Sequence, residues 1–240
     1  MGYGKIRKLA SLLLCAAMAF TLFGCAKEPE ESSQYPVRTD FKAPDSYYEI
    51  SFGEYKGGLH WLVLEEKDGK ALVISKEIIY VMENTGTTWR DSSVREWLNE
   101  EFYDKAFEEK YKDIILTTDV VIVDKITEND REKELPLYTT QDRVFLLDEY
   151  EFEMYFPRKS SVEAVNVPHT LFAEASAKEY EYSSLTDWWL RGSVDIMQNC
   201  YLFPLAEGDG TLCHTNKDYA KASGVRPAMW IDYDKYKAMK

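Results

Sequence analysis

The sequence predicts a single α+β domain built from small, mostly antiparallel sheets with helices between them. Strand-length apolar runs lie towards both ends of the chain, helix-like patterns lie between them, and the two types do not alternate as in a parallel α/β fold. Hydrophobic residues make up 45% of the chain and aromatic residues 14%. This composition supplies a core and excludes disorder of the bulk. We expect the 240-residue chain to hold one domain over residues 47–234.

Residues 1–24 are typical of a bacterial secretory signal. Three basic residues, Lys5, Arg7 and Lys8, precede an uncharged apolar run of about 15 residues. This run is shorter than the roughly 20 residues that a transmembrane helix needs. It ends in Leu22-Phe23-Gly24-Cys25, which resembles the lipobox of lipoproteins, so Cys25 is the predicted lipidation site. The alternatives are an uncleaved anchor helix and an ordinary signal in which Cys25 is incidental.

Charge and composition extend this interpretation. Residues 25–46 are polar and rich in Glu, Ser and Pro, which predicts a flexible tether. The chain carries 29 Lys and Arg against 42 Asp and Glu, a net charge of −13. This charge argues against a nucleic-acid partner and is repelled by anionic lipid, so membrane attachment would come from acyl chains on Cys25. We expect a protein held on the extracytoplasmic face of the cell membrane.

The first half of the domain predicts three strands and a helix. The expected strands are Tyr48–Phe52, Trp61–Leu64 and Ala71–Ser75, and Asp68-Gly69 would form the turn of a hairpin between the last two. The segment 91–96 is expected to open a helix, because Ser93 and Glu96 stand at capping-box spacing. Apolar residues then follow at mostly three- and four-residue intervals and are expected in the core: Val94, Trp97, Leu98, Phe102 and Phe107.

The second half predicts further strands around one short helix. Residues 124–135 are charge-dense and are expected to form an exposed loop, residues 152–156 are ambiguous, and residues 235–240 are expected to be a C-terminal tail. The remaining expected elements are strands at Ile114–Val123, Val144–Leu147, Trp188–Leu190, Tyr201–Leu205 and Val225–Ile231, a helix at Leu171–Lys178, and a turn at Gly208-Asp209-Gly210.

Two cysteines, Cys200 and Cys213, remain in the domain, because Cys15 lies in the signal and Cys25 at its end. A disulfide between them would close a 14-residue segment and contribute about 3 kcal/mol. Two buried thiols or a metal-binding pair remain as alternatives.

The sequence marks no catalytic residue, metal ligand or cofactor site. None of the three histidines, His60, His169 and His214, has a second His or an acidic residue at the spacing of a metal site on one helix. The motifs of zinc proteases, serine hydrolases, dinucleotide-binding proteins and P-loop proteins are absent. A pair of carboxylates acting on a glycan remains an alternative, and a couple of Cys200 with His214 is a weaker one.

Two segments, 186–192 and 224–230, combine Trp and Arg in apolar surroundings. Trp188 and Trp189 would point to opposite faces of a strand, so one ring is available to a sugar or to a partner's side chain. Arg191 and Arg226 would offer bidentate contacts. We take these four residues, with Asp187, as the candidate binding face. The alternative is structural, with each arginine locking neighbouring loops through its own hydrogen bonds.

An ordered series of motifs carries a family resemblance. The motifs are Phe52-Gly53-Glu54-Tyr55, His60 to Leu64, Ala71 to Ser75, Trp89, Ser92 to Asn99, Phe102-Tyr103, Asp142 to Leu147, Trp188 to Arg191, and Gly224 to Ala228. Over roughly residues 47–232 the chain resembles a family of domains of unknown function that is common in surface and secreted proteins of Gram-positive bacteria. That family has no established activity, so the resemblance implies a cellular location more than a function.

The C-terminal part is also similar to the end of C-type lectin-like domains, including the formylglycine-generating-enzyme group. This similarity implies a small sheet formed by the strands from Trp188 to Ile231, with a Cys200–Cys213 bridge across its loop. The Glu-Pro-Asn and Trp-Asn-Asp motifs of calcium-dependent sugar binders are absent, as are the metal-binding residues of the copper and iron enzymes. These departures argue against calcium-dependent sugar binding and against oxidase chemistry.

Together these observations predict a lipid-anchored, non-catalytic binding module whose ligand is a cell-envelope glycan or another surface protein. One alternative is an enzyme that acts on envelope polymers through unidentified carboxylates. Another is a structural lipoprotein whose acidic surface meets a basic partner.

Overall fold

The computed structural model describes residues 41–240 except 129–130, 136, 158–162, 182, 196–200 and 217–221. Within this part the chain forms one mixed α+β domain with mostly antiparallel sheets, which confirms the predicted fold class. The predicted signal, Cys25, most of the tether and Cys200 lie outside the described residues. Over the described part, no helix combines the length and apolar character needed to cross a membrane.

The first sheet has the order β1-β2-β3-β14 and is antiparallel throughout. Its strands are β1 (Glu49–Glu54), β2 (Gly58–Lys67), β3 (Lys70–Ser75) and β14 (Ala228–Asp232). The predicted hairpin is confirmed between β2 and β3. Its turn residues, Asp68 and Gly69, have φ values of 52° and 74°, the left-handed conformation that an Asp-Gly turn favours.

The second sheet has the order β4-β13-β9-β11-β10-β6-β7, and β12 also pairs with β11. The β13–β9 and β10–β6 pairs are parallel. A separate two-stranded sheet joins β5 (Thr118–Ile122) to β8 (Tyr138–Asp142). The strands of the second sheet are β4 (Tyr80–Met82), β6 (Asp124–Glu128), β7 (Arg131–Glu134), β9 (Ser183–Trp189), β10 (Ser193–Asp195), β11 (Tyr201–Ala206), β12 (Leu212–Asn216) and β13 (Ala222–Val225).

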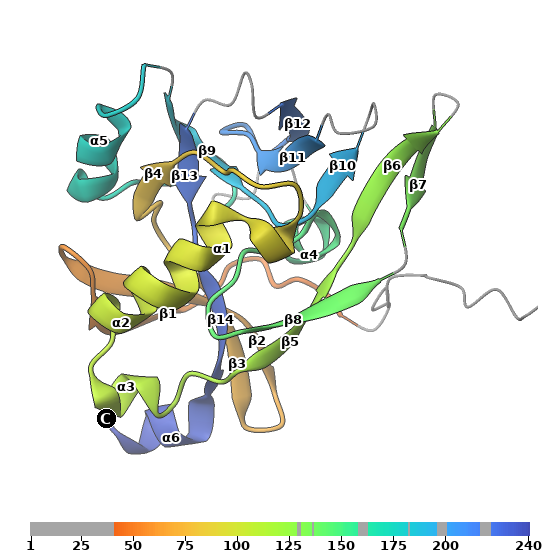
Figure 1. Ribbon diagram of the computed structural model, residues 1–240. Coiled ribbons are helices and arrows are strands. Elements are labelled where there is room, and N and C mark those ends of the chain that lie inside the picture. Colours follow the sequence, from red (N-terminus) through yellow and green to blue (C-terminus); the bar gives the residue numbers. More distant parts are fainter. Residues whose placement is uncertain are drawn as a thin grey trace, which may run out of the picture. The chain divides into compact units, whose positions relative to one another are not determined.

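One segment near the C-terminus belongs to both sheets. Only Arg226 and Pro227 separate β13 in the second sheet from β14 in the first, and the two strands follow one another in Figure 1. Proline has no amide hydrogen to donate to a sheet. Its carbonyl still accepts a hydrogen bond from the Ser75 amide of β3 at 2.8 Å. The predicted strand Val225–Ile231 is therefore broken at this pair, which places Arg226 where the two sheets meet.

The predicted helix is confirmed as one helical segment that includes a π-helical turn. It consists of α1 (Ser93–Trp97), η2 (Leu98–Phe102) and α2 (Tyr103–Ala106), preceded by the short turn η1 (Trp89–Asp91). The expected cap at Ser93 is wrong by one residue. Ser92 caps α1, and its side-chain oxygen accepts a hydrogen bond from the Arg95 amide. Ser93 is instead the first residue of α1, and its hydroxyl accepts from the Thr85 amide at 2.9 Å and donates to the Glu83 carbonyl at 3.1 Å.

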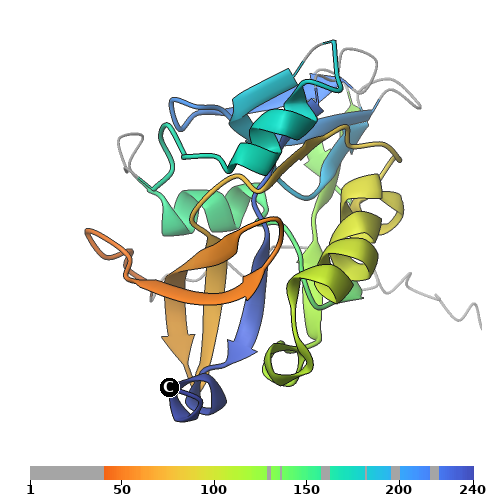
Figure 2. The same ribbon diagram turned by 90° about the vertical axis from the view of Figure 1, so that its left-hand side faces the viewer.

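The remaining helices are short. They are α3 (Glu109–Lys112), α4 (Glu149–Tyr155), α5 (Leu171–Ala177) and α6 (Tyr233–Ala238). Figures 1 and 2 both show α4 between the two sheets. Phe152 packs against Trp188 of β9, with ring centroids 5.5 Å apart, and the Tyr155 hydroxyl donates to Glu65 of β2 at 2.8 Å. This helix resolves the ambiguous segment 152–156.

Several other expectations need correction. The charged segment 124–135, expected to be a loop, forms the β6–β7 hairpin. Val144–Leu147 is buried but pairs only through Phe145, which exchanges hydrogen bonds with Ala228. The expected tail at 235–240 belongs largely to α6, because Asp232 caps that helix and Tyr236 packs on Phe52 at 5.6 Å. Phe41, expected in the tether, packs edge-on against Tyr155 at 4.9 Å.

Candidate binding surface

The two tryptophans of the predicted binding face are both fully buried. Trp188 packs on Phe152, and the Trp189 indole nitrogen donates to the Met82 carbonyl at 2.8 Å. The expectation that one of the two rings is exposed is wrong, because both faces of β9 are covered at its last two residues, although the strand is partly exposed before them. Neither ring offers a flat surface to a ligand.

Arg191 has a structural role, which was the alternative to ligand binding at this position. Its side chain is 3% exposed and is held by four acceptors. These are the carbonyls of Val121 and Leu146 and the carboxylates of Asp148 and Glu151, at 2.5 to 3.2 Å. Asp148 also caps α4. Arg191 therefore ties the start of α4 to two neighbouring segments.

Arg226 is also buried, but its surroundings differ. Its Nε atom donates to the Ser75 carbonyl at 2.7 Å, and its guanidinium lies 5.0 Å from the centroid of the Trp188 ring and 5.5 Å from that of Phe156. Within the described part of the chain, its two terminal nitrogens have no hydrogen-bond partner. Burial lowers the pKa of this guanidinium, and the negative charge of Glu163 only partly opposes that effect.

The last candidate, Asp187, organises a turn. Its Oδ1 atom accepts a hydrogen bond from the Gly208 amide at 3.0 Å, which fixes the predicted turn at Gly208-Asp209-Gly210 against β9. Cys213 is half-buried on β12 and has no disulfide partner among the described residues, and burial together with a hydrogen bond to Glu207 raises the pKa of its thiol to about 12. Since Cys200 lies outside the described residues, the disulfide stays a prediction.

The structure also forms an ion cluster that the sequence did not indicate. One oxygen of Glu149 lies 2.6 Å from His214 Nε2, and the other lies 2.6 Å from Lys125 Nζ. Burial alone would raise the pKa of Glu149, but hydrogen bonds from His214 and Lys125 outweigh burial and lower it to about 2. A carboxyl with this pKa is poorly suited to act as a general acid near neutral pH. Among the described residues, no group of three or more His, Cys, Asp or Glu side chains is arranged to hold a metal ion.

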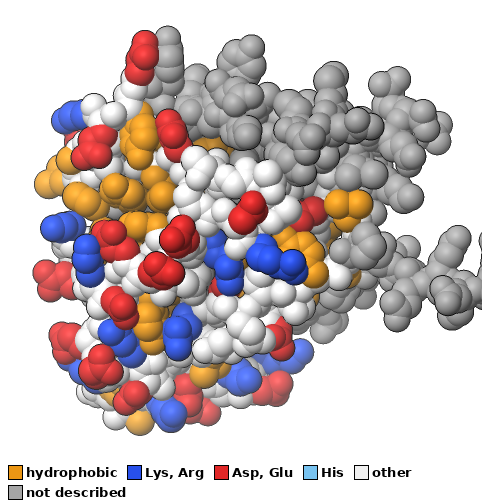
Figure 3. Space-filling model, in the orientation of Figure 1, with side chains coloured by type: hydrophobic (Ala, Val, Ile, Leu, Met, Phe, Trp, Pro, Cys, Tyr) orange, Lys and Arg blue, Asp and Glu red, His pale blue; other side chains and the backbone are white. Residues whose placement is uncertain are grey.

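In addition to these buried clusters, the structure has a partly exposed group of apolar side chains, which we call the aromatic strip. It consists of the half-buried rings of Tyr80, Trp97 and Phe172 with the adjacent Leu171. The Tyr80 ring lies between the other two, with centroids 4.9 Å from Trp97 and 5.3 Å from Phe172. Leu171 is 85% exposed, the most of any large hydrophobic residue in the described part. Figure 3 shows hydrophobic side chains gathered over α5 and β4.

Backbone and side-chain hydrogen bonds fix the elements that carry the aromatic strip. Thr170 caps α5, with its Oγ1 accepting from the Ala173 amide at 3.1 Å, and its own amide donates to the Ile78 carbonyl at 3.0 Å. Further along, the Ser176 hydroxyl accepts from the Val81 amide of β4 at 3.0 Å. These bonds hold α5 against β4, so the position of Phe172 relative to Tyr80 is set before any ligand arrives.

Carboxylates surround the aromatic strip. The Tyr55 hydroxyl, beneath the rings, donates to Glu101 at 3.2 Å, and burial together with that carboxylate raises the pKa of Tyr55 to about 12. Burial raises the pKa of Tyr80 as well, with added contributions from Tyr180, Glu179 and Glu101. Two exposed carboxylates lie at the rim, Glu83 directly after β4 and Glu179 shortly after α5, in addition to Glu101, which pairs with Lys105 at 3.0 Å. One ammonium, that of Lys56, lies over the Phe172 ring at 5.8 Å.

Sequence patterns do not predict this surface. The apolar stripe after Ser93 places Trp97 in the core, and composition places Leu171 in a short helix without indicating which face of that helix is exposed. One sequence feature could have indicated an exposed apolar surface. Leu171 and Phe172 are two large apolar residues together at the start of a helix that is otherwise rich in Ala and Ser.

The described residues form an α+β domain with a hydrophobic core, buried ionic clusters and the partly exposed aromatic strip. Residues 68–233 match the family described as a domain of unknown function, DUF6273. The chain belongs to this family. No curated protein and no solved structure matches it.

Proposed function

We propose that the protein is a lipid-anchored, extracytoplasmic, non-catalytic binding module whose ligand is a cell-envelope glycan or another surface protein. The observation that carries this proposal is the aromatic strip, in which Leu171 is 85% exposed beside three partly exposed rings. Contiguous exposed apolar side chains on a soluble domain mark interaction sites.

The buried ionic clusters support binding over catalysis. Arg191 is bonded to Asp148 and Glu151, and Glu149 is bonded to Lys125 and His214. These groups hold α4 against neighbouring strands, and Glu149 is kept ionised by its partners. These ion pairs stabilise the folded domain that carries the aromatic strip.

The proposed anchor is supported by the sequence pattern that ends at Cys25. Phe41 is already packed against Tyr155, so a tether from Cys25 would have about 16 residues. A flexible chain of that length has a mean reach of roughly 20 to 25 Å. That distance would hold the domain just above a lipid surface while leaving the aromatic strip free to meet a partner.

Ligand binding is tested by thermal unfolding of the chain that starts after Cys25, in the presence of solubilised cell-wall fragments and purified surface proteins. A ligand that binds only the folded domain raises the unfolding temperature, equivalent to about 2.7 kcal/mol at a hundredfold excess over Kd. The expected result is a shift with at least one ligand class that Leu171→Ser abolishes. A shift that Leu171→Ser leaves intact would place the binding surface elsewhere.

The anchor is tested separately with the full chain. Wild type is expected in the detergent-soluble membrane fraction and to incorporate labelled palmitate, whereas Cys25→Ser is expected to lose the label. Equal labelling of the two proteins would contradict lipidation at Cys25.

A further inference from the structure

We infer that the aromatic strip receives a protein segment that carries an apolar side chain flanked by Lys or Arg, and that it does not receive a glycan. This inference rests on the proposed binding function and narrows it to one class of partner. Three properties of the surface support it: the ring faces are occupied, the exposed part is apolar, and the rim is acidic.

The ring faces of the strip are already used within the domain. Tyr80 has Trp97 on one face and Phe172 on the other. Trp97 stacks on Tyr80 and on Phe102, with the second pair at 5.3 Å. Phe172 has Tyr80 on one face and the Lys56 ammonium over its ring. Since carbohydrate stacking needs an open aromatic face, the strip lacks the geometry that a sugar ring requires.

What remains exposed is a row of ring edges beside an aliphatic side chain. Leu171 is 85% exposed at the first turn of α5, a position where a polar residue would serve the helix equally well. An apolar side chain from a partner would gain roughly 25 cal/mol for each Å² that it buries here. The bonds from Thr170 and Ser176 keep α5 in place, so binding requires little ordering of this surface.

The charge of the rim determines which apolar partner is favoured. Glu83 directly follows β4 and Glu179 lies two residues beyond α5, and both residues are exposed at the edge of the strip. Glu101 lies nearby but is paired with Lys105 at 3.0 Å. A second copy of the chain would bring the same carboxylates face to face, and an anionic lipid surface would be repelled in the same way. A segment with Lys or Arg beside its apolar residue meets these carboxylates with opposite charge.

The experiment uses isothermal titration of the chain that starts after Cys25 with four probes. The first is a 12-residue synthetic peptide of leucines and lysines. The second replaces its leucines by serine, the third replaces its lysines by glutamate, and the fourth probe is soluble peptidoglycan fragments. We expect only the first peptide to bind, and Leu171→Ser to weaken that binding at least tenfold.

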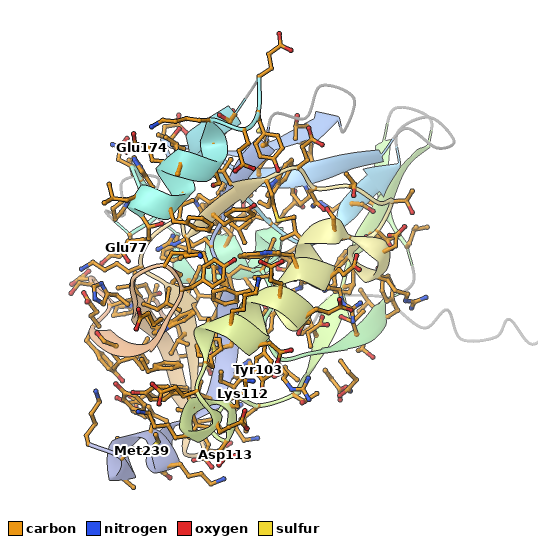
Figure 4. The ribbon with its side chains drawn as sticks, turned by 60° about the vertical axis from the view of Figure 1, so that its left-hand side comes forward. Glu77, Tyr103, Lys112, Asp113, Glu174 and Met239 are labelled. Carbon is orange, nitrogen blue, oxygen red and sulfur yellow. The ribbon has the colours of Figure 1, made fainter. Side chains whose placement is uncertain are left out.

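Two further variants test whether the peptide binds at the aromatic strip or is attracted only by the net negative charge of the protein. Met239 is also exposed and apolar, at 42%, and Figure 4 shows it on α6, at the end of the domain away from Glu174 on α5. Met239→Ser is therefore expected to bind as wild type does. The double variant Glu83→Gln with Glu179→Gln is expected to weaken binding and to reduce its dependence on salt, because two exposed rim charges are lost.

Three outcomes would overturn the inference. Equal binding of the leucine and serine peptides would reveal attraction by charge alone. Binding of peptidoglycan fragments that Leu171→Ser abolishes would preserve the proposed function but make the partner a glycan. Failure of the leucine-lysine peptide to bind wild type would remove the proposed partner class, and failure of every ligand in the thermal panel would remove the proposed function as well.

Discussion

Arg191 and Arg226 are both buried guanidinium groups close to the second sheet, yet their surroundings have little in common. Arg191 meets two carboxylates and two backbone carbonyls, whereas Arg226 has one carbonyl partner, two aromatic rings and two terminal nitrogens without a hydrogen bond among the described residues. The comparison shows that burial of an arginine does not by itself define its role. The partners determine whether the buried charge stabilises the fold or is tolerated by it.

The largest expected effect is at Arg191. Arg191→Met leaves Asp148 as a buried carboxylate without its cation, and Glu151 without its ion-pair partner. Removing one partner of such a pair costs about 3 to 5 kcal/mol. Urea denaturation followed by far-UV circular dichroism measures this loss. Arg191→Lys is expected to recover only part of it, because an ammonium cannot reproduce the planar fork of the guanidinium. Full recovery by lysine would indicate that charge alone matters at this position.

A second effect lies on the same helix, at Glu149. Its pKa is about 2 in the fold, below the ordinary value of 4.5, so its stabilisation is complete above pH 4.5 and is lost as the pH falls towards 2. We expect Glu149→Gln to lose about 2 to 3 kcal/mol at pH 7. The difference from wild type should shrink between pH 4.5 and pH 2, as measured by urea denaturation across that range. A difference that is constant with pH would show that the ion cluster does not depend on this carboxylate's charge.

Substitution of Arg226 tests whether the two buried arginines contribute differently to the free energy of unfolding. Arg226→Met removes one hydrogen bond and the contacts with two rings, worth about 1 to 3 kcal/mol, but it also removes the cost of burying two unpaired nitrogens. The net loss is expected to be at least about 2 kcal/mol smaller than for Arg191→Met, in the same denaturation assay. Equal losses of unfolding free energy for Arg226→Met and Arg191→Met would contradict the different roles of the two arginines.

The smallest expected effect is at Leu171, outside both clusters. Leu171→Ser is expected to change the free energy of unfolding by less than about 0.5 kcal/mol, because the side chain is 85% exposed. Thermal unfolding without ligand checks this expectation. A loss above about 1 kcal/mol would mean that Leu171 stabilises the folded domain through its packing, and the binding data for this variant would then need a different control.

Local patterns in the sequence predicted the elements that depend on neighbouring residues. The hairpin at Asp68-Gly69, the helix that starts near Ser92 and the helix at Leu171 follow from turn chemistry, capping and composition. The class of fold followed from the order of these elements along the chain.

The candidate site could not be predicted in the same way, because it depends on distant contacts. Strand alternation places Trp188 and Trp189 on opposite faces, but it does not reveal that both faces of β9 are covered at these two residues. Arg191 finds its carboxylates 43 and 40 residues away, at Asp148 and Glu151. The aromatic strip joins Tyr80, Trp97 and Phe172 from three separate elements, and no local pattern brings these rings together.

The segment that runs from β13 through Arg226 and Pro227 into β14 has a consequence for how the chain acquires its fold. β13 pairs with β4 and β9, and β14 pairs with β3, so one stretch near the C-terminus completes both sheets. Until that stretch is available, β3 and β4 each lack a neighbour provided by distant sequence. A chain emerging from the ribosome therefore cannot complete either sheet until residues 222–232 have been synthesised. Most of its β-structure must wait for this late stretch, so we expect its folding to be largely post-translational.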